Sequence, residues 1–260
     1  MAKVRVIRKE RPLIIAVEQS ALAQRMDPAF WNPKYEEILE RLASGPYGQS
    51  LRPVRTLLDQ SGIAQGPKGK SAYVAKGLPF VRISNIKHTG VDMVEGVKYV
   101  QEGGPMDPPN GRPKPGFVLL VRTGATIGKV AIWLEDYPPA AVSSVIYRLR
   151  FMGVNPFFAC TFLKSLYGQS QLERLKNGPA VENLNLEEVG SIQMVVPPPE
   201  LQMEVETQYR EMSHHHLSSQ KAASEGRRID SDNELKIARL KLDDLLARFT
   251  EHLAGTRPKL

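Results

Sequence analysis

The sequence predicts an α+β fold, in which an irregular, mainly antiparallel sheet domain with packed helices is followed by a long C-terminal coiled-coil helix. Up to residue 198, short runs rich in β-branched and aromatic residues alternate with glycine- and proline-rich connections, and two segments carry apolar residues at helical spacing. Beyond it, apolar residues recur at alternating steps of about four and three. The chain therefore divides into a domain of residues 1–198, with residues 1–45 as its N-terminal strand and helix part, and a helical segment of residues 199–260.

The composition is that of a globular chain with long loops. Of 260 residues, 42% are hydrophobic, 24% are charged and 20 are prolines. No apolar run approaches a membrane span, and the run at residues 13–17 is too short for a secretory signal core, so we expect a cytoplasmic protein without a membrane partner. The single cysteine, Cys160, stands among phenylalanines and is expected to be a small buried residue rather than a nucleophile.

The net charge of +7 is unevenly distributed along the chain. Residues 60–154 hold 12 Lys and Arg against 6 Asp and Glu, whereas residues 199–260 hold 10 against 11. A positive field concentrated in a loop-rich region suits a polyanion such as nucleic acid, although basic loops are also ordinary solubilising surface.

The N-terminal part is expected to contain one or two strands and a helix. The strands fall within residues 3–17, where apolar and charged residues alternate. The helix should begin after Asn32, a capping residue that Pro33 follows, and it should end at Gly45. Residues 57–78 contain four glycines and three lysines and are expected to form a mobile basic loop.

The rest of the domain supplies further strands and a second helix. Strands are expected over residues 78–86, 117–121, 130–133, 141–151 and 192–196. The helix begins at Asn155 and Pro156 and carries a broad face rich in phenylalanine, which we expect to be core and not a base-stacking platform. Residues 103–116 hold five prolines and are expected to be a structured, irregular connection.

Residues 116–133, GFVLLVRTGATIGKVAIW, are predicted to form a strand, an exposed turn and a strand. Gly124 and Gly128 allow positive φ or a close backbone approach to a ligand. Four side chains of this central turn are able to donate hydrogen bonds to phosphate or base edges: Arg122, Thr123, Thr126 and Lys129. A hairpin with a solvated polar tip is the alternative. A nucleotide-binding phosphate loop is excluded, because only three residues separate the glycines and Val130 follows the lysine.

The strand expected at residues 78–86 ends in a second group of candidate nucleic-acid contacts: Arg82, Asn85, Lys87 and His88. Asparagine suits adenine edges and lysine suits guanine or phosphate, while an ordinary polar turn has the same composition. A polar loop over residues 175–185 adds Lys176 and Asn177.

The C-terminal segment carries an apolar seam on a highly charged background. The seam consists of Leu201, Val205, Tyr209, Met212 and His216, then Leu235, Ala238, Leu242, Leu245 and Phe249. A single helix over residues 200–253 would reach about 80 Å, far beyond the diameter of the domain, so its seam would need a partner. The polar residues 224–233, which include Gly226, mark the place where such a helix would fray or break.

No catalytic or metal-binding constellation is apparent, so we expect a chain that binds without catalysing and needs no cofactor. Asp107-Pro108-Pro109-Asn110 approaches a DNA amino-methyltransferase motif but lacks the aromatic residue that stacks on an extruded base. Glu234-Leu235-Lys236 resembles the carboxylate-lysine pair of a nuclease site. It lies on the presumed coiled-coil helix, however, where an active site could not be enclosed. The histidines at 214–216 point in different directions on a helix and lack a further ligand, so they are expected to be surface residues.

Several segments occur in the order seen in target recognition domains of type I restriction-modification specificity subunits, a family that the chain resembles over roughly residues 25–250. The segments are RMDPAFWNPKY (25–35), LPFVRISNI (78–86), GFVLLVRTGATIGKVAI (116–132), NPFFACTFLKS (155–165), LERLKNGPAVENLNLEEV (172–189) and VVPPPELQ (195–202). Full-length members carry two such domains and two long helices, so this chain resembles a half-length form. The Gly-Asp usual before the VLLVRTG-like strand is Gly116-Phe117 here.

The resemblance implies a non-catalytic subunit that reads one half of a bipartite site in double-stranded DNA. It also implies recruitment of a methyltransferase subunit and, in the complete complex, of a motor-nuclease subunit. The base edges are read either by the polar residues named above or, if the shared turn is scaffold, by the loops around residues 60–76 and 103–115.

The seam and the resemblance together predict an antiparallel homodimer through residues 200–250, or pairing with a second half-subunit. The expected contact residues are Leu235, Leu242, Leu245 and Phe249. A second class of function is an interaction module that docks on or inhibits restriction-modification subunits without reading DNA. An independent nuclease is the third.

Overall fold

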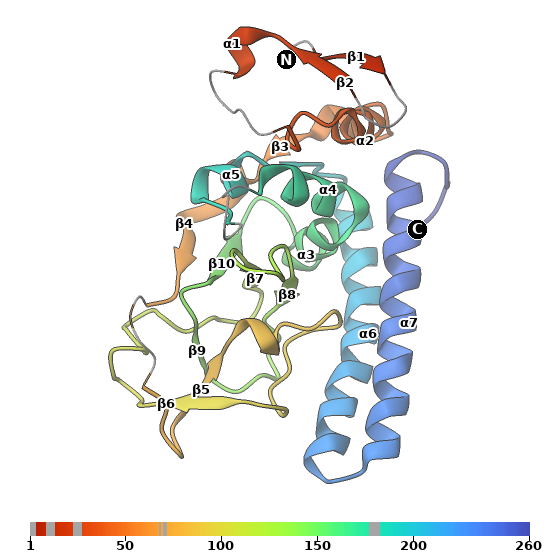
Figure 1. Cartoon of the computed structure of the whole chain (residues 1–260). Coiled ribbons are helices and arrows are strands. Elements are labelled where there is room, and N and C mark those ends of the chain that lie inside the picture. The colour runs from red at the N-terminus through yellow and green to blue at the C-terminus, as the bar shows by residue number, and fades with distance from the viewer. Residues whose placement is uncertain (1–3, 9–13, 23–27, 68, 70–71, 177–182) are drawn as a thin grey trace.

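The structure is a computed structural model of the chain and describes residues 4–8, 14–22, 28–67, 69, 72–176 and 183–260. A body of strands and short helices stands beside two long helices, and a small two-stranded sheet lies at one end of the body (Figure 1). The helices are α1 (Gln19–Leu22), α2 (Pro33–Ala43), α3 (Pro156–Lys164), α4 (Leu166–Leu175), α5 (Leu186–Ser191), α6 (Pro199–Ser224) and α7 (Arg228–Leu253). The strands are β1 (Val4–Arg8), β2 (Ile14–Val17), β3 (Arg52–Pro53), β4 (Leu58–Gln65), β5 (Leu78–Val81), β6 (Lys98–Val100), β7 (Val118–Val121), β8 (Val130–Ile132), β9 (Ala141–Val142), β10 (Ile146–Phe151) and β11 (Gln193–Met194).

Four strands form the central sheet in the order β4-β10-β7-β8, and each neighbouring pair is antiparallel. A smaller sheet has the order β6-β5-β9, in which β5 and β9 run parallel. The pairs β1–β2 and β3–β11 are antiparallel. Short helices packed on an irregular, mainly antiparallel sheet confirm the predicted α+β class.

The central sheet is enclosed by other elements. Helix α3 contacts β7, β8 and β10, and Arg148 of β10 ties the connection over residues 103–115 to the sheet. All four residues of β7 are 0% exposed, so both faces of this strand are covered. Double burial explains why the strand is an unbroken apolar run in the sequence instead of an alternating one.

Two asparagines start helices where the sequence predicts them. The Oδ1 atom of Asn32 accepts a hydrogen bond from the backbone N–H of Lys34 at 3.1 Å, and Pro33 takes the first position of α2. Asn155 accepts from the N–H groups of Phe157 and Phe158 at 2.9 and 3.3 Å at the start of α3. Each asparagine satisfies backbone donors that the first turn of a helix leaves without a partner.

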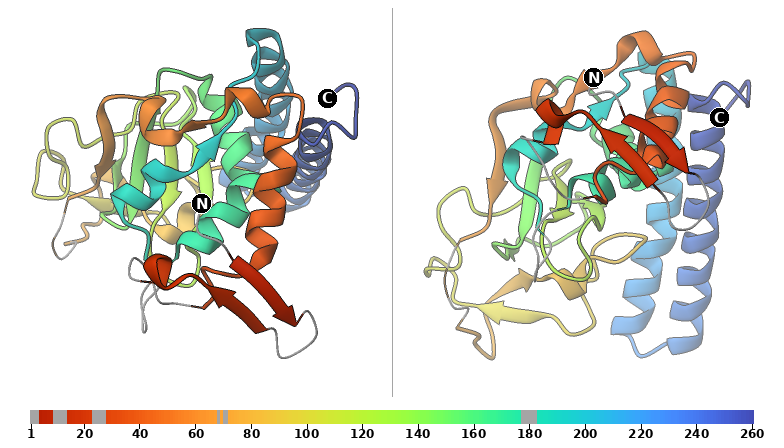
Figure 2. Two further views of the ribbon diagram at one scale, coloured as in Figure 1. Left: turned by 90° about the horizontal axis from the view of Figure 1, so that it is seen from above. Right: turned by 45° about the horizontal axis from the view of Figure 1, so that its top comes forward.

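The second predicted helix is two helices, α3 and α4. Ser165 adopts an extended backbone between them, so the helix that starts at Asn155 ends at Lys164. Seen from above, α3 and α4 lie between the strands and the two long helices (Figure 2). The aromatic residues of α3 are core, as predicted, and burial raises the pKa of the Cys160 thiol, which fits a small interior residue.

Two of the expected loops and strands are placed differently by the structure. The predicted basic loop over residues 57–78 begins with a strand, β4, which pairs with β10 along the edge of the central sheet. Gly62, at φ +62°, lies in this strand beside a shift in the pairing register. Because a glycine is unusual inside a strand, the sequence pattern indicates a loop here. The strand expected over residues 78–86 ends at Val81 and continues as a short 3-10 turn, Ile83–Asn85.

The C-terminal segment is a helical hairpin, α6 and α7, and not one long helix. The reversal follows Ser224: Gly226 takes φ +76°, its N–H donates to the carbonyl of Ala223, and the N–H of Arg227 donates to the carbonyl of Ala222. These two bonds form a Schellman motif, which satisfies the last carbonyls of α6. The break lies within the polar residues at which the sequence indicates one.

The seam of the helical hairpin is covered inside the chain. Tyr209 of α6 and Phe249 of α7 are fully buried, and their rings lie 5.7 Å from Phe157 and 5.3 Å from Phe158 of α3. Leu242 and Leu245 are buried in the same core, while Leu235 is half-buried. The expectation of an unpaired seam is therefore wrong, because α6 and α7 cover each other and α3 covers both. Among the described residues, none of the helices is both long and apolar enough to cross a membrane.

Candidate nucleic-acid interface

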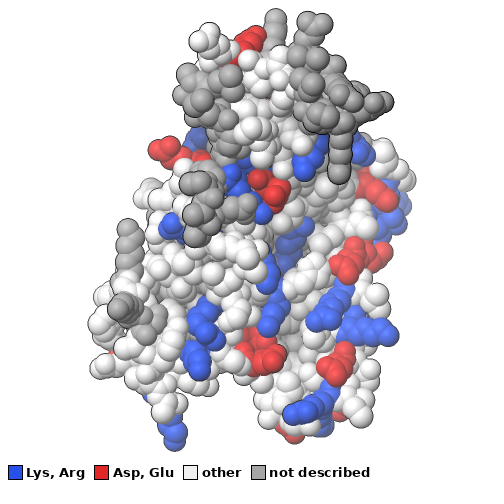
Figure 3. All heavy atoms as spheres, viewed as in Figure 1, with Lys and Arg blue, Asp and Glu red and all other residues white. Residues whose placement is uncertain are grey.

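A furrow runs where the body meets the helical hairpin. It consists of two adjoining cavities of about 470 and 420 Å³, which share Lys87, His88 and Lys129 as lining residues. Lys164 lines the first cavity and Arg239 of α7 lines the second. Basic side chains follow this boundary on the molecular surface (Figure 3). The furrow therefore carries basic side chains from both the body and the helical hairpin, while Asp92, Glu95 and Asp232 also line its second cavity.

Residues 87–95 form one wall of the furrow, which we call the 87–95 turn. Lys87 is exposed, with its Nζ atom 3.7 Å from an oxygen of Asp92. His88 is also exposed, and its Nε2 atom lies 2.7 Å from Oδ1 of Asp243 on α7. The backbone carbonyl of His88 accepts a hydrogen bond from Nζ of Lys164 at 2.7 Å. The turn is thus linked to both α3 and α7 while the side chains of Lys87 and His88 reach solvent.

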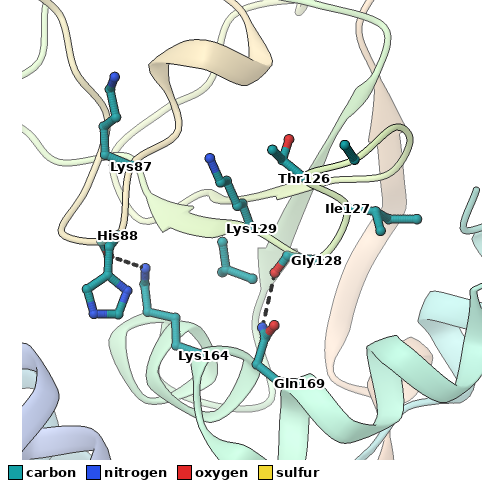
Figure 4. Close-up of a pocket in the computed structure, with 10 residues that line it drawn as sticks. Lys87, His88, Thr126, Ile127, Gly128, Lys129, Lys164 and Gln169 are labelled. Carbon is teal, nitrogen blue, oxygen red and sulfur yellow. Dashed lines mark hydrogen bonds between the residues drawn. The ribbon is translucent and has the colours of Figure 1, made fainter. Parts of the chain in front are cut away.

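Residues 125–130, the second half of the central turn (residues 122–129) and the residue after it, form the opposite wall. Gly124 and Gly128 have φ values of +85° and +90°, as the sequence indicates. The carbonyl of Gly128 accepts a hydrogen bond from Nε2 of Gln169 on α4 at 3.0 Å, which holds the turn against the helices. The side chains of Thr126 and Lys129 line the furrow and point to the same side as Lys87 (Figure 4). Four predicted contact residues, Lys87, His88, Thr126 and Lys129, are therefore brought together.

Lys164 belongs to this site but was not predicted from the sequence. It is the last residue of α3, and its side chain reaches across to the 87–95 turn (Figure 4). Burial lowers the pKa of its ammonium, although part of the side chain remains accessible. A lysine that ends an otherwise apolar helix is the signal in the sequence, and its partner lies 76 residues away along the chain.

Asn85, predicted to contact DNA, is a structural residue. Its side chain is 2% exposed. Oδ1 accepts from the backbone N–H of Arg82 at 3.0 Å, and Nδ2 donates to the carbonyl of Asp92 at 3.1 Å. Arg82 donates from Nη2 to the carbonyl of Gly96 at 2.7 Å. A buried amide that is fully engaged has nothing left to offer a base edge, so this prediction needs correction at Asn85.

Arg122 and Thr123 lie in a second location, away from the furrow. The guanidinium of Arg122 donates to Oδ1 of Asn183 at 3.2 and 3.1 Å and to Oε1 of Gln65 at 3.1 Å. It also stands 5.1 Å from the ring centre of Tyr147. Thr123 pairs with Asn183 through an isolated backbone bridge. These contacts join the end of β7 to the late polar loop, so Arg122 holds the scaffold together.

The polar loop over residues 175–185 is described only in part. Lys176 follows the last residue of α4 and forms an ion pair with Glu173 at 2.5 Å. Asn177 lies outside the described residues. The predicted contact residues are therefore distributed between the furrow, the region around Arg122 and a segment that the structure does not describe.

Arg148 is a buried guanidinium that the sequence did not single out. It sits on β10 at 5% exposure and donates to the carbonyls of Asn110 and Gly111 in the connection 103–115 and, at 3.0 Å, to the carbonyl of Gln65 in β4. Burial lowers its pKa. One side chain thus links the two segments named from the sequence as alternative base-reading loops.

The connection 103–115 is structured, as predicted. Arg112 donates to both carboxylate oxygens of Asp107, at 2.9 and 2.6 Å, and to Glu102 at 2.8 Å. The hydrogen bond from Arg112 is the main reason that the pKa of Asp107 is lowered. The resemblance of residues 107–110 to a methyltransferase motif therefore has a structural explanation, because Asp107 serves as the anchor of the connection.

The histidines at 214–216 have three different environments. His216 is buried against the body, His215 lies 2.7 Å from a carboxylate oxygen of Glu234, and His214 is exposed. The expectation of three surface histidines is wrong for His216, because the helical hairpin packs on the body at this turn of α6. Within the described ranges, no three His, Cys, Asp or Glu side chains gather in a group that could hold a metal ion.

No protein-family model and no curated protein matches the chain. Solved structures do match. For the type I restriction-modification system S subunit from M. genitalium, the TM-score is 0.45 and the identity 13%, over 67% of this chain and 40% of that one. For the HsdS subunit from Thermoanaerobacter tengcongensis, the TM-score is 0.42 and the identity 16%, over 91% of this chain and 56% of that one. For the type IIG restriction endonuclease BpuSI, the TM-score is 0.52 and the identity 10%, over 95% of this chain and 36% of that one. The chain spans 36–56% of the length of these proteins, and it shares its fold with a part of BpuSI.

Proposed function

We propose that this chain is the sequence-specific DNA-binding subunit of a type I-like restriction-modification system. In this proposal it reads one half-site of duplex DNA, and partner methyltransferase and restriction subunits carry out the chemistry. The observation that carries the proposal is the set of three lysine amines, from Lys87, Lys129 and Lys164, that line one furrow from three different elements. The fold and the motifs of the sequence are consistent with it.

The size of the furrow decides how DNA would lie on it. Cavities of about 470 and 420 Å³ cannot enclose a duplex, so the amines would reach phosphates of a backbone that runs along the rim. Each phosphate neutralised by a lysine releases counterions, so affinity should fall steeply as salt rises. Phosphate contacts fix the register of a protein on DNA but carry no sequence information.

Base reading would come from groups adjacent to the lysines. His88 and Thr126 are two side chains with hydrogen-bonding groups that line the furrow beside the lysines. The segments around residues 60–76 and 103–115 are the other candidates, and Arg148 holds both of them to the central sheet. In either case the reading groups stand on segments whose backbones are tied to the core, which favours a specific over a loose complex.

Pairing with a second copy or a second half-subunit would use other residues than those expected. Leu242, Leu245 and Phe249 are buried within the chain and cannot form a contact between copies unless the helical hairpin opens. The outer face of α7 exposes Ile237 and Leu240 instead. Equilibrium sedimentation of the unaltered chain and of Leu240→Glu would test this pairing. A dimer that Leu240→Glu dissociates supports it, and a monomer at micromolar concentration contradicts it.

The proposed function is tested by selecting duplexes from a randomised library at about 0.15 M salt, with and without a methyltransferase subunit. Enrichment of one sequence motif is the expected result. If the chain binds the methyltransferase subunit but enriches no sequence motif, the result would favour an interaction module over a subunit that reads DNA. Retention of all sequences equally would leave only non-specific electrostatic binding.

A further inference from the structure

The 87–95 turn is held by the helical hairpin as well as by the body. Helix α6 contributes His216 and Gln220, whose side chains point at the backbone of this turn. Oε1 of Gln220 accepts from the N–H of Met93 at 2.7 Å, and Nε2 donates to the carbonyl of Val91 at 3.0 Å. The side-chain amide of Gln220 thus satisfies one N–H and one C=O of the turn, as the backbone of a neighbouring strand would do in a sheet. The side chain of Gln220 therefore gives the turn two backbone partners from α6.

His216 completes this network from one turn earlier on α6. Its Nδ1 atom lies 3.0 Å from Oγ1 of Thr89, and its Nε2 atom lies 2.8 Å from Nε2 of Gln220. The amide nitrogen of Gln220 carries two hydrogens, one for Val91 and one for the ring. In one neutral tautomer, Nε2 accepts from Gln220 and Nδ1–H donates to Thr89; in the other, Nε2–H donates to the carbonyl of Val91 at 3.2 Å and Nδ1 accepts from the Thr89 hydroxyl. Burial lowers the pKa of His216, which favours a neutral ring in either case.

Close packing leaves the turn little room to move. A Cβ atom on Gly90 would lie 2.7 Å from Nε2 of His216 and 2.8 Å from the hydroxyl of Tyr137. The same hydroxyl accepts from the N–H of Val91 at 3.1 Å. From the inner side, the backbone N–H of Asp92 donates to the carbonyl of Asn85 at 2.8 Å. Any shift of the turn would therefore require a shift of α6 or the loss of several hydrogen bonds.

We propose that His216 and Gln220 are positioning residues for DNA contact, and that α6 sets the place from which Lys87 and His88 reach the duplex. The inference rests on the proposed function of the furrow. The helical hairpin is then more than a spacer, because its first helix is a structural part of the surface that contacts DNA. A binding surface that is ordered beforehand does not lose conformational entropy when DNA binds, so loosening the turn should weaken binding without removing any group that touches DNA.

The test compares two substitutions within the helical hairpin. Gln220→Ala removes the two hydrogen bonds that Gln220 makes to the backbone of the 87–95 turn. Glu234→Gln is the matched control, since it alters the contact between His215 and Glu234 inside the hairpin and does not touch the turn. Hydrogen exchange at the backbone amide of Met93, bonded to Gln220, reports the turn directly. Duplex affinity and preference for the selected sequence over a scrambled one are measured on the same samples.

For Gln220→Ala we expect fast exchange at Met93, unchanged protection along α7, and affinity for the selected duplex lower by about tenfold. For Glu234→Gln all three readouts should match the unaltered chain. Thr89→Val, which keeps the shape of the residue and removes only the hydroxyl that meets His216, should give a smaller loss in the same direction.

Two results would overturn the proposal, and they can be told apart. If the unaltered chain binds its selected duplex and Gln220→Ala binds it equally well despite fast exchange at Met93, the positioning role is wrong while the proposed function stands. If the unaltered chain shows no preference for any duplex, the proposed function fails, and the positioning role fails with it.

Discussion

The furrow and the region around Arg122 are built from similar polar residues but use them in opposite ways. In the furrow, Lys87 and Lys129 keep their amines at the surface, and the amine of Lys129 has no carboxylate partner among the described residues. Around Arg122, the guanidinium is occupied by Asn183 and Gln65. Asn85, only two residues before Lys87, is occupied in the same way.

The difference follows from what surrounds each residue. A lysine carries one charge on a flexible stem that extends into water, whereas guanidinium and amide groups bind several acceptors or donors at fixed angles. Where backbone carbonyls and N–H groups are buried without a backbone partner, guanidinium and side-chain amide groups supply the missing hydrogen bonds. Strand-end polar residues therefore divide into those that stay accessible at the surface and those that satisfy the scaffold, and only the arrangement of neighbours separates them.

The largest effect should come from the furrow. Lys87→Ala combined with Lys129→Ala should lower affinity for a selected duplex about a hundredfold at low salt and reduce the slope of log affinity against log salt by about two. The unfolding midpoint should not change. Lys236→Ala, on an exposed position of α7 outside the furrow, is the control. Binding titrations at several salt concentrations measure both quantities, and equal losses for Lys236→Ala would remove the furrow from the interface.

Asn85→Ala should act on stability. It leaves the N–H of Arg82 and the carbonyl of Asp92 without their partner, and we expect the free energy of unfolding to fall by about 2 kcal/mol. Ser84→Ala, at the exposed neighbouring position, should change it by less than about 0.5 kcal/mol. Urea unfolding of the three proteins measures the difference. An Asn85→Ala variant of normal stability that had lost DNA binding would show that Asn85 does meet the duplex.

Arg122→Lys should sharpen the contrast between the two regions. The charge remains, but a lysine cannot bind Asn183 and Gln65 together, so we expect about 1 kcal/mol less stability. Duplex affinity should change by less than about threefold. Lys129→Arg, the reverse change in the furrow, should leave both quantities nearly unaltered. If Arg122→Lys weakened DNA binding as much as loss of a furrow lysine, the proposed division would be wrong.

The smallest expected effect is a pH dependence from His216. Its pKa in the folded chain is lowered from 6.5, mainly by burial, with the nearby Lys164 acting in the same direction and Asp92 in the opposite one. Below pH 6.5 the unfolded chain takes up a proton that the folded chain resists, so stability falls as pH falls and is constant above that value. Between pH 7 and pH 5.5 the unaltered chain should lose up to about 1 kcal/mol more than His216→Gln. Parallel urea series would show equal losses for the two proteins if the pKa of His216 were the same in the folded and unfolded states.

Elements set by local chemistry were predictable from the sequence. The caps at Asn32 and Asn155 and the strands β7 and β8 lie where the residue types place them, since each depends on neighbours along the chain. The reversal at Gly226 was not fixed by the seam, because the same apolar period suits one long helix or two antiparallel ones. Only the positive φ of a glycine among polar residues distinguishes the two, and a glycine also tolerates other conformations.

Parts of the site that depend on distant partners could not be predicted. Lys164 joins the furrow through a carbonyl 76 residues earlier, and His216 reaches Thr89 across 127 residues. Strand β4 pairs with β10, more than 80 residues later, and its own glycine and polar residues give little sign of a strand. Composition indicated a polyanion as the ligand, but the amines that line one furrow are brought together by tertiary packing.

Arg148 has a consequence for attempts to change specificity by grafting. Its guanidinium spans β4 and the connection 103–115, so a transplant of either segment alone would leave donors of a buried cation facing an unfamiliar backbone. A chimera should fold well only when both segments are exchanged as a unit and the arginine is retained. Natural variation that retargets such a domain would accordingly be expected to change the two segments together.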